Sequence, residues 1–236
     1  MRIGILQPSY LPWLGFLDQM AQSDVFVLYD DVQFSKGAWQ NRNRIKTANG
    51  VQWLTVPVLT GGRERQLIKD VEIDNHTDWR KAHLKSITQN YSKAPFFNEY
   101  IGLFENVYSS EWMKLIDLCV RLIMDIKSTL GVAAQVRLSS SIERNTADRV
   151  SRLIEICKTF RADEFIEGSA GKDYLEGAGE REFEQSGIKL IYHDYQHPAY
   201  PQLYGEFASN LSIIDLLFNN GRKSLDILTN KKEARA

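Results

Sequence analysis

The sequence predicts an α/β fold with a three-layer, mainly parallel and Rossmann-like sheet, an antiparallel hairpin and a helical insertion. Three observations support this prediction: strands and helices alternate at both ends of the chain, an Asn-Gly pair separates two alternating segments, and helical spacing extends over residues 78–131. The chain has 236 residues, of which 43% are hydrophobic, so it can build a sizeable core. We expect a single domain over residues 1–236.

The first thirty residues have the order of a βαβ unit. Residues 2–6 ("RIGIL") form a short apolar run that is typical of a buried strand. Residues 12–22 have helical spacing, and residues 24–30 ("DVFVLYD") form a second apolar run. Such a unit closes with right-handed parallel pairing of its two strands.

The next segments predict a hairpin and then a group of helices. Asn49-Gly50 lies between two alternating segments, which is typical of a hairpin with a type I′ turn, and we expect this antiparallel element to join the sheet. Three segments with helical spacing follow between residues 78 and 130. Gly131 directly follows them and is a typical helix C-terminal stop.

The last hundred residues return to alternation of strands and helices. The predicted strands and helices lie in turn at residues 135–140, 146–160, 164–168, 188–195 and 212–221. Together with the first unit, this alternation favours a parallel sheet covered by helices.

Composition and charge place the chain among ordinary globular proteins. The net charge of −1 gives no overall basic field of the kind that dominates nonspecific nucleic-acid binding. Gln7, Pro8 and Pro12 interrupt the apolar N-terminus, so we expect a cytoplasmic protein without a signal peptide or membrane span. Cys119 and Cys157 lie in segments with helical apolar spacing and are predicted core thiols.

Four polar, aromatic-rich segments follow the carboxyl ends of predicted strands, at residues 7–13, 30–33, 169–174 and 196–202. In open α/β sheets, ligands bind outside these strand ends. We therefore expect the four segments to converge on one crevice.

The Asp30-Asp31 pair ends the second predicted strand. Aspartate at such a place often turns or caps the chain, and this structural interpretation remains open. In the functional interpretation, Asp30 accepts hydrogen bonds from an amine or hydroxyl of the substrate, and Asp31 holds Lys36 or Arg42.

The segment "NRNRIK" has two chemically different faces. A period of two puts Arg42, Arg44 and Lys46 on one face, and Asn43 and Ile45 on the other together with the preceding asparagine. Arginine suits bidentate contacts to phosphate or carboxylate, and asparagine can donate and accept along a sugar or base edge. A nucleotide-linked ligand would use both faces, whereas an edge strand protected by charge would have the same pattern.

The glycine-rich segment "GSAGKDY" does not match a P-loop, because only two residues separate Gly168 from Gly171 and no Ser or Thr follows Lys172. Its amides and lysine could hold an anion, and a plain connection is the alternative.

His197 is the predicted general acid or base, because it follows a strand and the ordinary pKa of histidine suits proton transfer near neutrality. A structural histidine is the alternative. His193 lies four residues before it, but Pro198 follows at once and the preceding residues predict a strand, so we expect no metal site.

Several motifs resemble the WbqC-like protein family. They are "QPSYLPWLGF", "DDVQFSKGAWQNRNRIK", "WLTVPV", "SAGKDYL", "HPAYPQ" and "SIIDLLFNNG", which occur in this order between Ile3 and Gly221. Members are bacterial proteins often associated with surface-polysaccharide and O-antigen (lipopolysaccharide) gene clusters, and the resemblance implies a role in making or modifying an unusual sugar. The reaction we associate with the family is transfer of an aminoacyl or acyl group, such as glycine, to the amine of a nucleotide-linked amino sugar.

A second resemblance is to nucleotidylyltransferases whose first strand leads into an H-x-G-H motif. Tyr10 and Trp13 stand where the two histidines would fall, so nucleotidyl transfer by that mechanism is in doubt. Either aromatic ring could still stack on a nucleotide.

We therefore expect an enzyme, a transferase that acts on a nucleotide-linked sugar. A non-catalytic nucleotide- or sugar-binding component of the same pathway and an ATP-dependent ligase are the alternatives. The predicted catalytic residues are His197, Asp30 and Asp31. The predicted substrate-binding residues are Gln7, Tyr10, Trp13, Gln33, Lys36, Trp39, Asn41, Arg42, Asn43, Lys46, Gly168, Ser169, Lys172, Tyr174, Tyr200 and Gln202. The family resemblance assigns a role in the site to all of these residues except Asp30 and Ser169.

The sequence specifies no cofactor, although ATP or an activated acyl donor would suit the reaction. The expected partner is a nucleotide-linked sugar. Nucleic acid is not expected, except that a tRNA remains open as an aminoacyl donor. The oligomeric state is not defined by the sequence.

Overall fold

The computed structural model describes residues 1–146 and 148–230, which form two compact units. Each unit is assembled from segments that are far apart in the sequence. Unit 1 contains Met1–Gln7, Asp18–Asp31 and Ala133–Gln196, and unit 2 contains Pro8–Leu17, Val32–Val132 and the residues from His197 onward. The expectation of a single domain stays a prediction.

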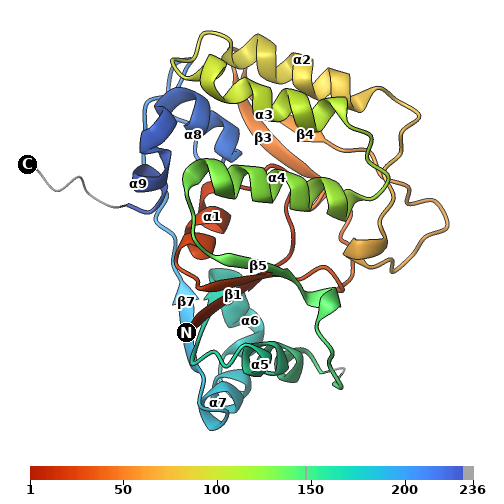
Figure 1. Ribbon diagram of the computed structural model, residues 1–236, viewed down its shortest axis with the longest axis vertical. Coiled ribbons are helices and arrows are strands. Elements are labelled where there is room, and N and C mark those ends of the chain that lie inside the picture. The colour runs from red at the N-terminus through yellow and green to blue at the C-terminus, as the bar shows by residue number, and fades with distance from the viewer. Residues whose placement is uncertain (147, 231–236) are drawn as a thin grey trace, which may run out of the picture. The chain divides into compact units, whose positions relative to one another are not determined.

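Unit 1 is built on a five-stranded parallel sheet with the order β5-β2-β1-β6-β7 (Figure 1). The strands are β1 (Arg2–Leu6), β2 (Val25–Leu28), β5 (Gln135–Leu138), β6 (Glu164–Gly168) and β7 (Lys189–His193). The chain builds the sheet outward from β1 through β2 to β5, and then returns to the other side of β1 to add β6 and β7. The α/β class and the mainly parallel, Rossmann-like sheet are confirmed.

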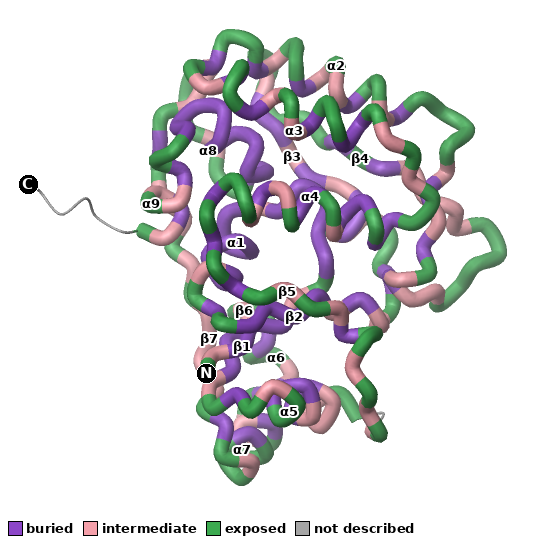
Figure 2. The backbone as a smooth tube through the Cα atoms, viewed as in Figure 1, coloured by how far each residue is buried: buried purple, intermediate pink, exposed green. Residues whose placement is uncertain are grey.

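The centre of this sheet is buried, as Figure 2 shows for β1 and β2. Because both faces are covered, these strands read as continuous apolar runs rather than as alternating ones. The ring of Phe165 in β6 stacks on Phe183, with 5.1 Å between the ring centroids. Three helices of unit 1 gather beside the sheet: α5 (Arg149–Thr159), α6 (Lys172–Leu175) and α7 (Ala178–Gln185). The predicted helix 146–160 includes Ala147, which lies outside the described residues.

The boundary between the units passes through α1 (Leu14–Ala21). In its second half, which belongs to unit 1, Gln19 donates a hydrogen bond to the carbonyl oxygen of Ile166, at 2.9 Å. Asp18 lies 2.6 Å from Nε2 of His193, and both side chains are nearly buried. His193 therefore has a carboxylate partner, and no group of metal-binding side chains occurs among the described residues.

Unit 2 contains the predicted hairpin, formed by β3 (Arg42–Thr47) and β4 (Gly50–Thr55). The hairpin is a separate two-stranded sheet, so the expectation that it joins the main sheet is wrong. The turn also differs from the prediction. Thr47 pairs with Gly50, which has a φ of 107°, whereas neither Ala48 nor Asn49 has a positive φ, so the turn is not type I′.

The helices of unit 2 agree with the predicted helical segment. They are α2 (Trp79–Tyr91), α3 (Phe97–Ser109) and α4 (Leu115–Leu130), followed later in the chain by α8 (Ile213–Asn220) and α9 (Ser224–Leu228). Figure 1 shows α2 and α3 side by side. α4 ends at Gly131, whose φ of 72° is the left-handed conformation that favours glycine. Phe218 of α8 packs against Phe97 and Phe104 of α3.

Both cysteines are buried core residues, as predicted. Burial raises the pKa of the Cys119 thiol well above its usual range and that of Cys157 to about 12, so both stay protonated near neutrality. Within the described residues, no helix is long and apolar enough to span a bilayer.

Candidate functional site

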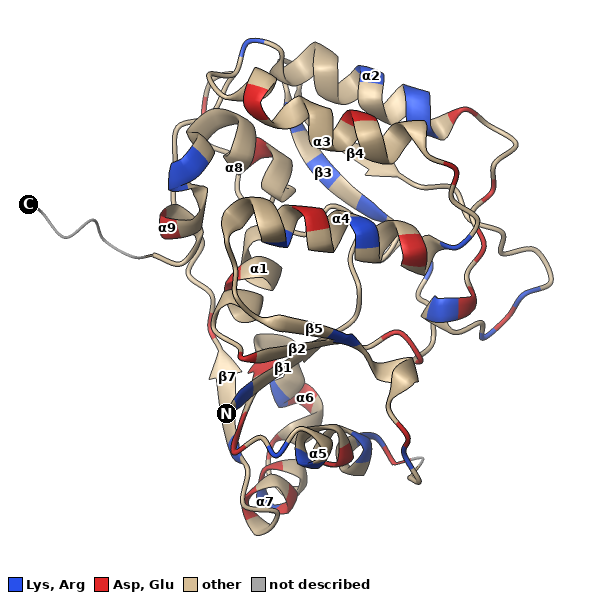
Figure 3. Ribbon diagram, viewed as in Figure 1, with Lys and Arg blue, Asp and Glu red and all other residues tan. Residues whose placement is uncertain are grey.

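The hairpin of unit 2 has one buried face and one exposed face. Asn43, Ile45 and Leu54 point inward and are buried. Arg44 lies directly opposite Trp53 in the strand register, so these two side chains share the other face with Arg42. Figure 3 shows the Lys and Arg positions spaced along β3. The predicted separation of cationic and amide faces is therefore present.

Two tryptophans and two arginines form a cluster on the exposed face. Trp39 and Trp53 are each 42% exposed, and their ring centroids are 5.3 Å apart. The guanidinium carbon of Arg42 lies 4.3 Å from the Trp53 centroid, and that of Arg44 lies 5.5 and 5.6 Å from the two rings. We call these four residues the hairpin cluster. Its rings can stack on a planar or sugar ring, and its cations can attract an anion.

No carboxylate of the described residues forms an ion pair with Arg42 or Arg44. The Nε atoms of both arginines also lack a hydrogen-bond partner within the described chain. The positive charge of the hairpin cluster is therefore not neutralised by the neighbouring protein. Exposed Lys36 lies on the same loop as Trp39, next to Gly37, where an added Cβ would come within 3.6 Å of the Arg42 guanidinium.

Lys46 continues the cationic face but is covered by a loop, and it is only 4% exposed. Its ammonium donates to Oε1 of Gln202 at 3.0 Å and to the carbonyl oxygen of Glu206 at 2.5 Å. Gln202 in turn bonds both backbone groups of Ala208 at 2.9 Å. Lys46 and Gln202 were both predicted to bind substrate. Their hydrogen bonds instead join them to each other and fix the loop between residues 202 and 208.

A buried carboxyl, Asp215, lies beside this loop anchor and was missed from the sequence. The hydroxyl of Tyr91 donates to Asp215 at 2.9 Å and accepts from the backbone amide of Lys46 at 2.9 Å. Burial raises the pKa of Asp215 to about 6, although Tyr91, Tyr200, Gln202 and Lys46 each lower it. Asp215 lies inside α8, and the apolar pattern of this helix did not predict that a carboxyl group would be buried there.

His197 is held by backbone groups on both ring nitrogens. Nδ1 donates to the carbonyl oxygen of Pro198 at 2.9 Å, and Nε2 accepts from the amide of Asn210 at 3.2 Å. Burial lowers the pKa of His197, so the neutral ring predominates at pH 7. The carbonyl oxygen of Asn210 accepts from Arg44 at 2.9 Å, which connects His197 to the hairpin cluster. To act as a general base, Nε2 of His197 would have to lose the hydrogen bond that it accepts from the Asn210 amide.

Tyr10, Asn41 and Asn43 are framework residues in this structure. Tyr10 is fully buried, and its hydroxyl contacts Tyr108 and Nδ1 of His83, the latter at 2.8 Å. Asn43 donates to the carbonyl oxygens of Tyr10 and Leu11, at 3.3 and 2.6 Å. Asn41 donates to the carbonyl oxygen of Val56 at 2.9 Å. The side-chain nitrogens of both asparagines are therefore occupied inside unit 2, whereas Oδ1 of Asn41 is buried without a hydrogen-bond partner among the described residues.

Two further predicted residues of unit 2, Trp13 and Gln33, each form an isolated bridge. Trp13 pairs with Ser212 in an isolated bridge, and its ring lies over Gly15, where an added Cβ would approach it to 2.2 Å. Gln33 is exposed and forms an isolated bridge with Leu67.

Unit 1 contains the other predicted site residues at the carboxyl ends of its strands. Asp30 is buried and accepts hydrogen bonds from the hydroxyl of Ser139 at 2.9 Å, and from the amide and hydroxyl of Ser140 at 2.9 and 2.7 Å. These bonds join the end of β2 to the end of β5. They agree with the structural interpretation of the aspartate pair.

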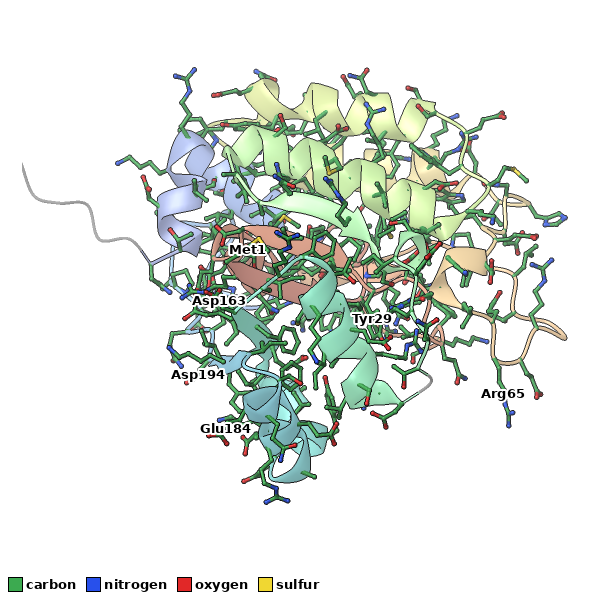
Figure 4. The ribbon with its side chains drawn as sticks, turned by 60° about the horizontal axis from the view of Figure 1, so that its bottom comes forward. Met1, Tyr29, Arg65, Asp163, Glu184 and Asp194 are labelled. Carbon is green, nitrogen blue, oxygen red and sulfur yellow. The ribbon has the colours of Figure 1, made fainter. Side chains whose placement is uncertain are left out.

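Asp31 forms ion pairs with Arg144 and Arg152, two cations that the sequence analysis did not connect with it. The side chains of Asp31 and Arg144 are only 12% and 7% exposed. Both guanidinium groups also lie near the ring of Tyr29, at 5.9 and 5.4 Å from its centroid. Figure 4 labels Tyr29, which directly follows β2.

The glycine-rich segment follows β6 and contains a carboxyl that was missed from the sequence, Glu167. Gln7 is exposed at the end of β1, and Gly168 closes β6. Ser169 opens a single 3-10 turn that leads into α6. The hydroxyl of Tyr174 donates to Glu167 at 2.9 Å. The ammonium of Lys172 lies 5.3 Å from the Tyr192 ring centroid.

Fold and site together define an α/β protein with a Rossmann-like parallel sheet and a separate hairpin that carries an exposed aromatic and cationic cluster. The model of the WbqC-like protein family matches residues 7–227, and the chain belongs to this family. The uncharacterized protein Rv1507c of Mycobacterium tuberculosis is 39% identical over 230 residues, which cover 96% of this chain and 97% of that protein. No solved structure gives a significant match.

Proposed function

We propose that this protein is an enzyme of bacterial surface-polysaccharide biosynthesis that acts on a nucleotide-linked amino sugar, bound on the hairpin cluster. It transfers an aminoacyl or acyl group, such as glycine, to the amine of the sugar. The observation that supports ligand binding is the exposed Trp39 and Trp53 pair beside two arginines that form no ion pair with a carboxylate of the described residues. The proposed reaction and the O-antigen context come from the family resemblance, and the expected cytoplasmic location comes from the interrupted apolar N-terminus.

The chemistry of the hairpin cluster suits a nucleoside diphosphate. A base stacked on an aromatic side chain contributes about 1–3 kcal/mol to binding. Guanidinium groups bind phosphate oxygens in bidentate fashion, and Arg44 is already oriented by its bond to the carbonyl oxygen of Asn210 at 2.9 Å. Base stacking and diphosphate binding would therefore occur on one face of the hairpin.

Binding of sugar nucleotides tests the ligand. Trp53→Ala and Arg42→Ala are each expected to weaken binding of a uridine or thymidine diphosphate sugar about 10- to 100-fold, measured by calorimetry or quenching of tryptophan fluorescence. Arg121→Ala is the matched control, because Arg121 is an exposed cation on α4 that pairs with Asp125. If the two hairpin variants and the control bind the sugar nucleotide with equal affinity, the hairpin cluster is not its binding site.

A non-catalytic binding role is the second candidate, and one observation favours it. Both ring nitrogens of His197 are engaged by backbone groups, so the predicted base has no lone pair ready to accept a proton. Incubation of the protein with amino-sugar nucleotides and a panel of ester, thioester and ATP-activated donors separates the two roles. Tight binding without turnover across the panel would favour the binding component.

A further inference from the structure

Residues 197–210 form a loop along the cationic face of β3, and both segments belong to unit 2. The loop covers Lys46 through the hydrogen bonds described above. An Nη nitrogen of Arg44 donates to the carbonyl oxygen of Asn210 at 2.9 Å, and the carbonyl oxygen of Arg44 accepts from the amide of Ser212 at 2.8 Å. The loop therefore ends beside Arg44, which is a member of the hairpin cluster.

Asn210 closes this loop in a conformation that few residues adopt. Its φ of 55° is left-handed, and asparagine tolerates this region better than most residues that have a side chain. Both of its backbone groups are bonded: the amide donates to Nε2 of His197 at 3.2 Å, and the carbonyl oxygen accepts from Arg44. Asn210 therefore connects an imidazole ring to a cation of the hairpin cluster.

The ring of His197 is held so that Nε2 accepts a hydrogen bond. Nδ1 donates to the carbonyl oxygen of Pro198 at 2.9 Å, which places the single proton of the neutral ring on Nδ1. The ring packs against Tyr200 and Phe207 of the same loop, with 6.1 and 5.8 Å between the ring centroids. Only the neutral form of His197 can accept the Asn210 amide, because the protonated ring is a donor at both nitrogens.

We infer that His197 and Asn210 are positioning residues of the ligand site, which aim the Arg44 guanidinium at an anionic group of the bound ligand. Neutral His197 holds Asn210 in its left-handed conformation, and the Asn210 carbonyl fixes one Nη nitrogen of Arg44. The second Nη nitrogen forms no hydrogen bond with the described residues and remains for a phosphate oxygen. This inference rests on the proposed function, because it concerns the site on which the sugar nucleotide is bound.

The proposed contacts make ligand affinity depend on pH. Burial lowers the pKa of His197 from 6.5, and the bond to Pro198 partly opposes this change. Below that pKa, an N–H group at Nε2 would face the N–H of Asn210, so the bond between them is lost. Affinity is therefore expected to decrease as the pH falls through the pKa of His197. The diphosphate of a sugar nucleotide is esterified at both ends and stays ionised over this range.

The loop also contacts α2 and α8, through Tyr204 and Leu203. The other titratable or charged groups of the loop and of these elements around it are Arg44 and Lys46 of β3, Tyr91 of α2, Asp215 of α8, and Tyr200 and Glu206 of the loop. Asp215 has a pKa of about 6 and also titrates in this range. The pH dependence is therefore assigned by substituting His197 itself.

Two substitutions of His197 separate positioning from a merely structural role. His197→Ala removes the acceptor and is expected to weaken binding of a uridine or thymidine diphosphate sugar about 5- to 10-fold near neutral pH, measured by calorimetry. His197→Gln keeps an acceptor oxygen near the place of Nε2 and does not titrate. It is expected to bind within about twofold of the wild type near neutrality and to lose the decrease in acid. His76→Gln is the matched control, since His76 is an exposed histidine that pairs with Asp74.

A double-mutant cycle tests whether His197 acts through Arg44. Arg44→Ala is expected to weaken binding about 10-fold, because the guanidinium is lost. When His197→Ala is added to Arg44→Ala, affinity is expected to change by less than about twofold. Additive losses would show that His197 does not act through Arg44 and would overturn the inference.

Asn210 is tested by the conformation of its backbone. Asn210→Gly permits the left-handed conformation and is expected to keep wild-type affinity. Asn210→Val disfavours this conformation and is expected to weaken binding as much as His197→Ala does. Nuclear magnetic resonance gives a readout without ligand. In the wild type, the Asn210 amide and Arg44 Nε signals are expected to shift together as His197 titrates, and in His197→Gln this common shift should be absent.

The possible failures are distinguishable. If Arg42→Ala weakens binding but His197→Ala does not, the positioning role is overturned and the proposed ligand site remains. A pH dependence that His197→Gln leaves unchanged, or an Asn210 amide signal that does not follow His197, also overturns the positioning role alone. A wild type that binds no sugar nucleotide at neutral or acidic pH overturns both the positioning role and the proposed function.

Discussion

At the scale of single residues, Arg42 and Asn43 are adjacent polar residues whose side chains lie on opposite faces of the same strand. Arg42 lies over the ring of Trp53 on the exposed face. Asn43 is fully buried and donates to two backbone carbonyl oxygens. The period of two predicts that they face opposite ways. It does not predict which face is covered, because that depends on Tyr10 and Leu11, more than thirty residues earlier in the chain.

Asn43→Ala is therefore expected to affect stability more than ligand binding. The substitution leaves the buried carbonyl oxygens of Tyr10 and Leu11 without a donor, at a cost of about 2–4 kcal/mol in the free energy of unfolding. Urea unfolding measures this cost. Asn49→Ala, in the exposed hairpin turn, is the control and should change stability by less than about 0.5 kcal/mol. Similar values for the two variants would contradict the framework role of Asn43.

At the scale of elements, locally encoded features were predicted well. The strands, the hairpin and the helices of residues 78–130 follow from periodicity, which is a property of neighbouring residues. The turn was displaced by one residue, since Gly50 pairs with Thr47 instead of standing in the middle of the turn. The hairpin also forms its own sheet. Sheet partners depend on contacts between distant segments, which the local pattern of β3 and β4 does not contain.

The corrected turn gives a prediction for Gly50. Its φ of 107° is unfavourable for any side chain, although nothing lies within 4 Å of an added Cβ. Gly50→Ala is therefore expected to destabilise the fold through backbone strain, by about 1–2 kcal/mol. Gly61→Ala is the matched control, because Gly61 has equal space and no positive φ. Equal unfolding midpoints in urea for the two variants would contradict this explanation.

At the scale of the whole molecule, the α/β class was predictable because alternating strands and helices favour a parallel sheet. The membership of each unit was not predictable, because both units combine distant segments. The site residues divide accordingly. Trp39, Arg42 and His197 belong to unit 2, whereas Asp30 and Tyr174 belong to unit 1. Trp53 and Glu167 were missed because each is part of an ordinary strand pattern.

The discontinuity of unit 2 predicts the behaviour of a fragment. A peptide of residues 32–132 contains the hairpin and α2 to α4, but it lacks the partners of Asn43, of Lys46 and of the α3 aromatic rings. We expect it to show no cooperative thermal unfolding and a weak near-ultraviolet circular dichroism signal, in contrast to the full chain. A sharp unfolding transition of the fragment would contradict this dependence on the missing segments.

The bond between Lys46 and Gln202 also has a consequence for synthesis on the ribosome. These two residues are separated by most of the chain, and translation adds about 5–20 residues per second. Lys46 therefore waits roughly 10–30 s for its partner to be made. During that interval the nascent hairpin presents its unpaired ammonium and its apolar inward face to solvent, and exposed apolar surface of this kind makes partly folded chains prone to aggregation.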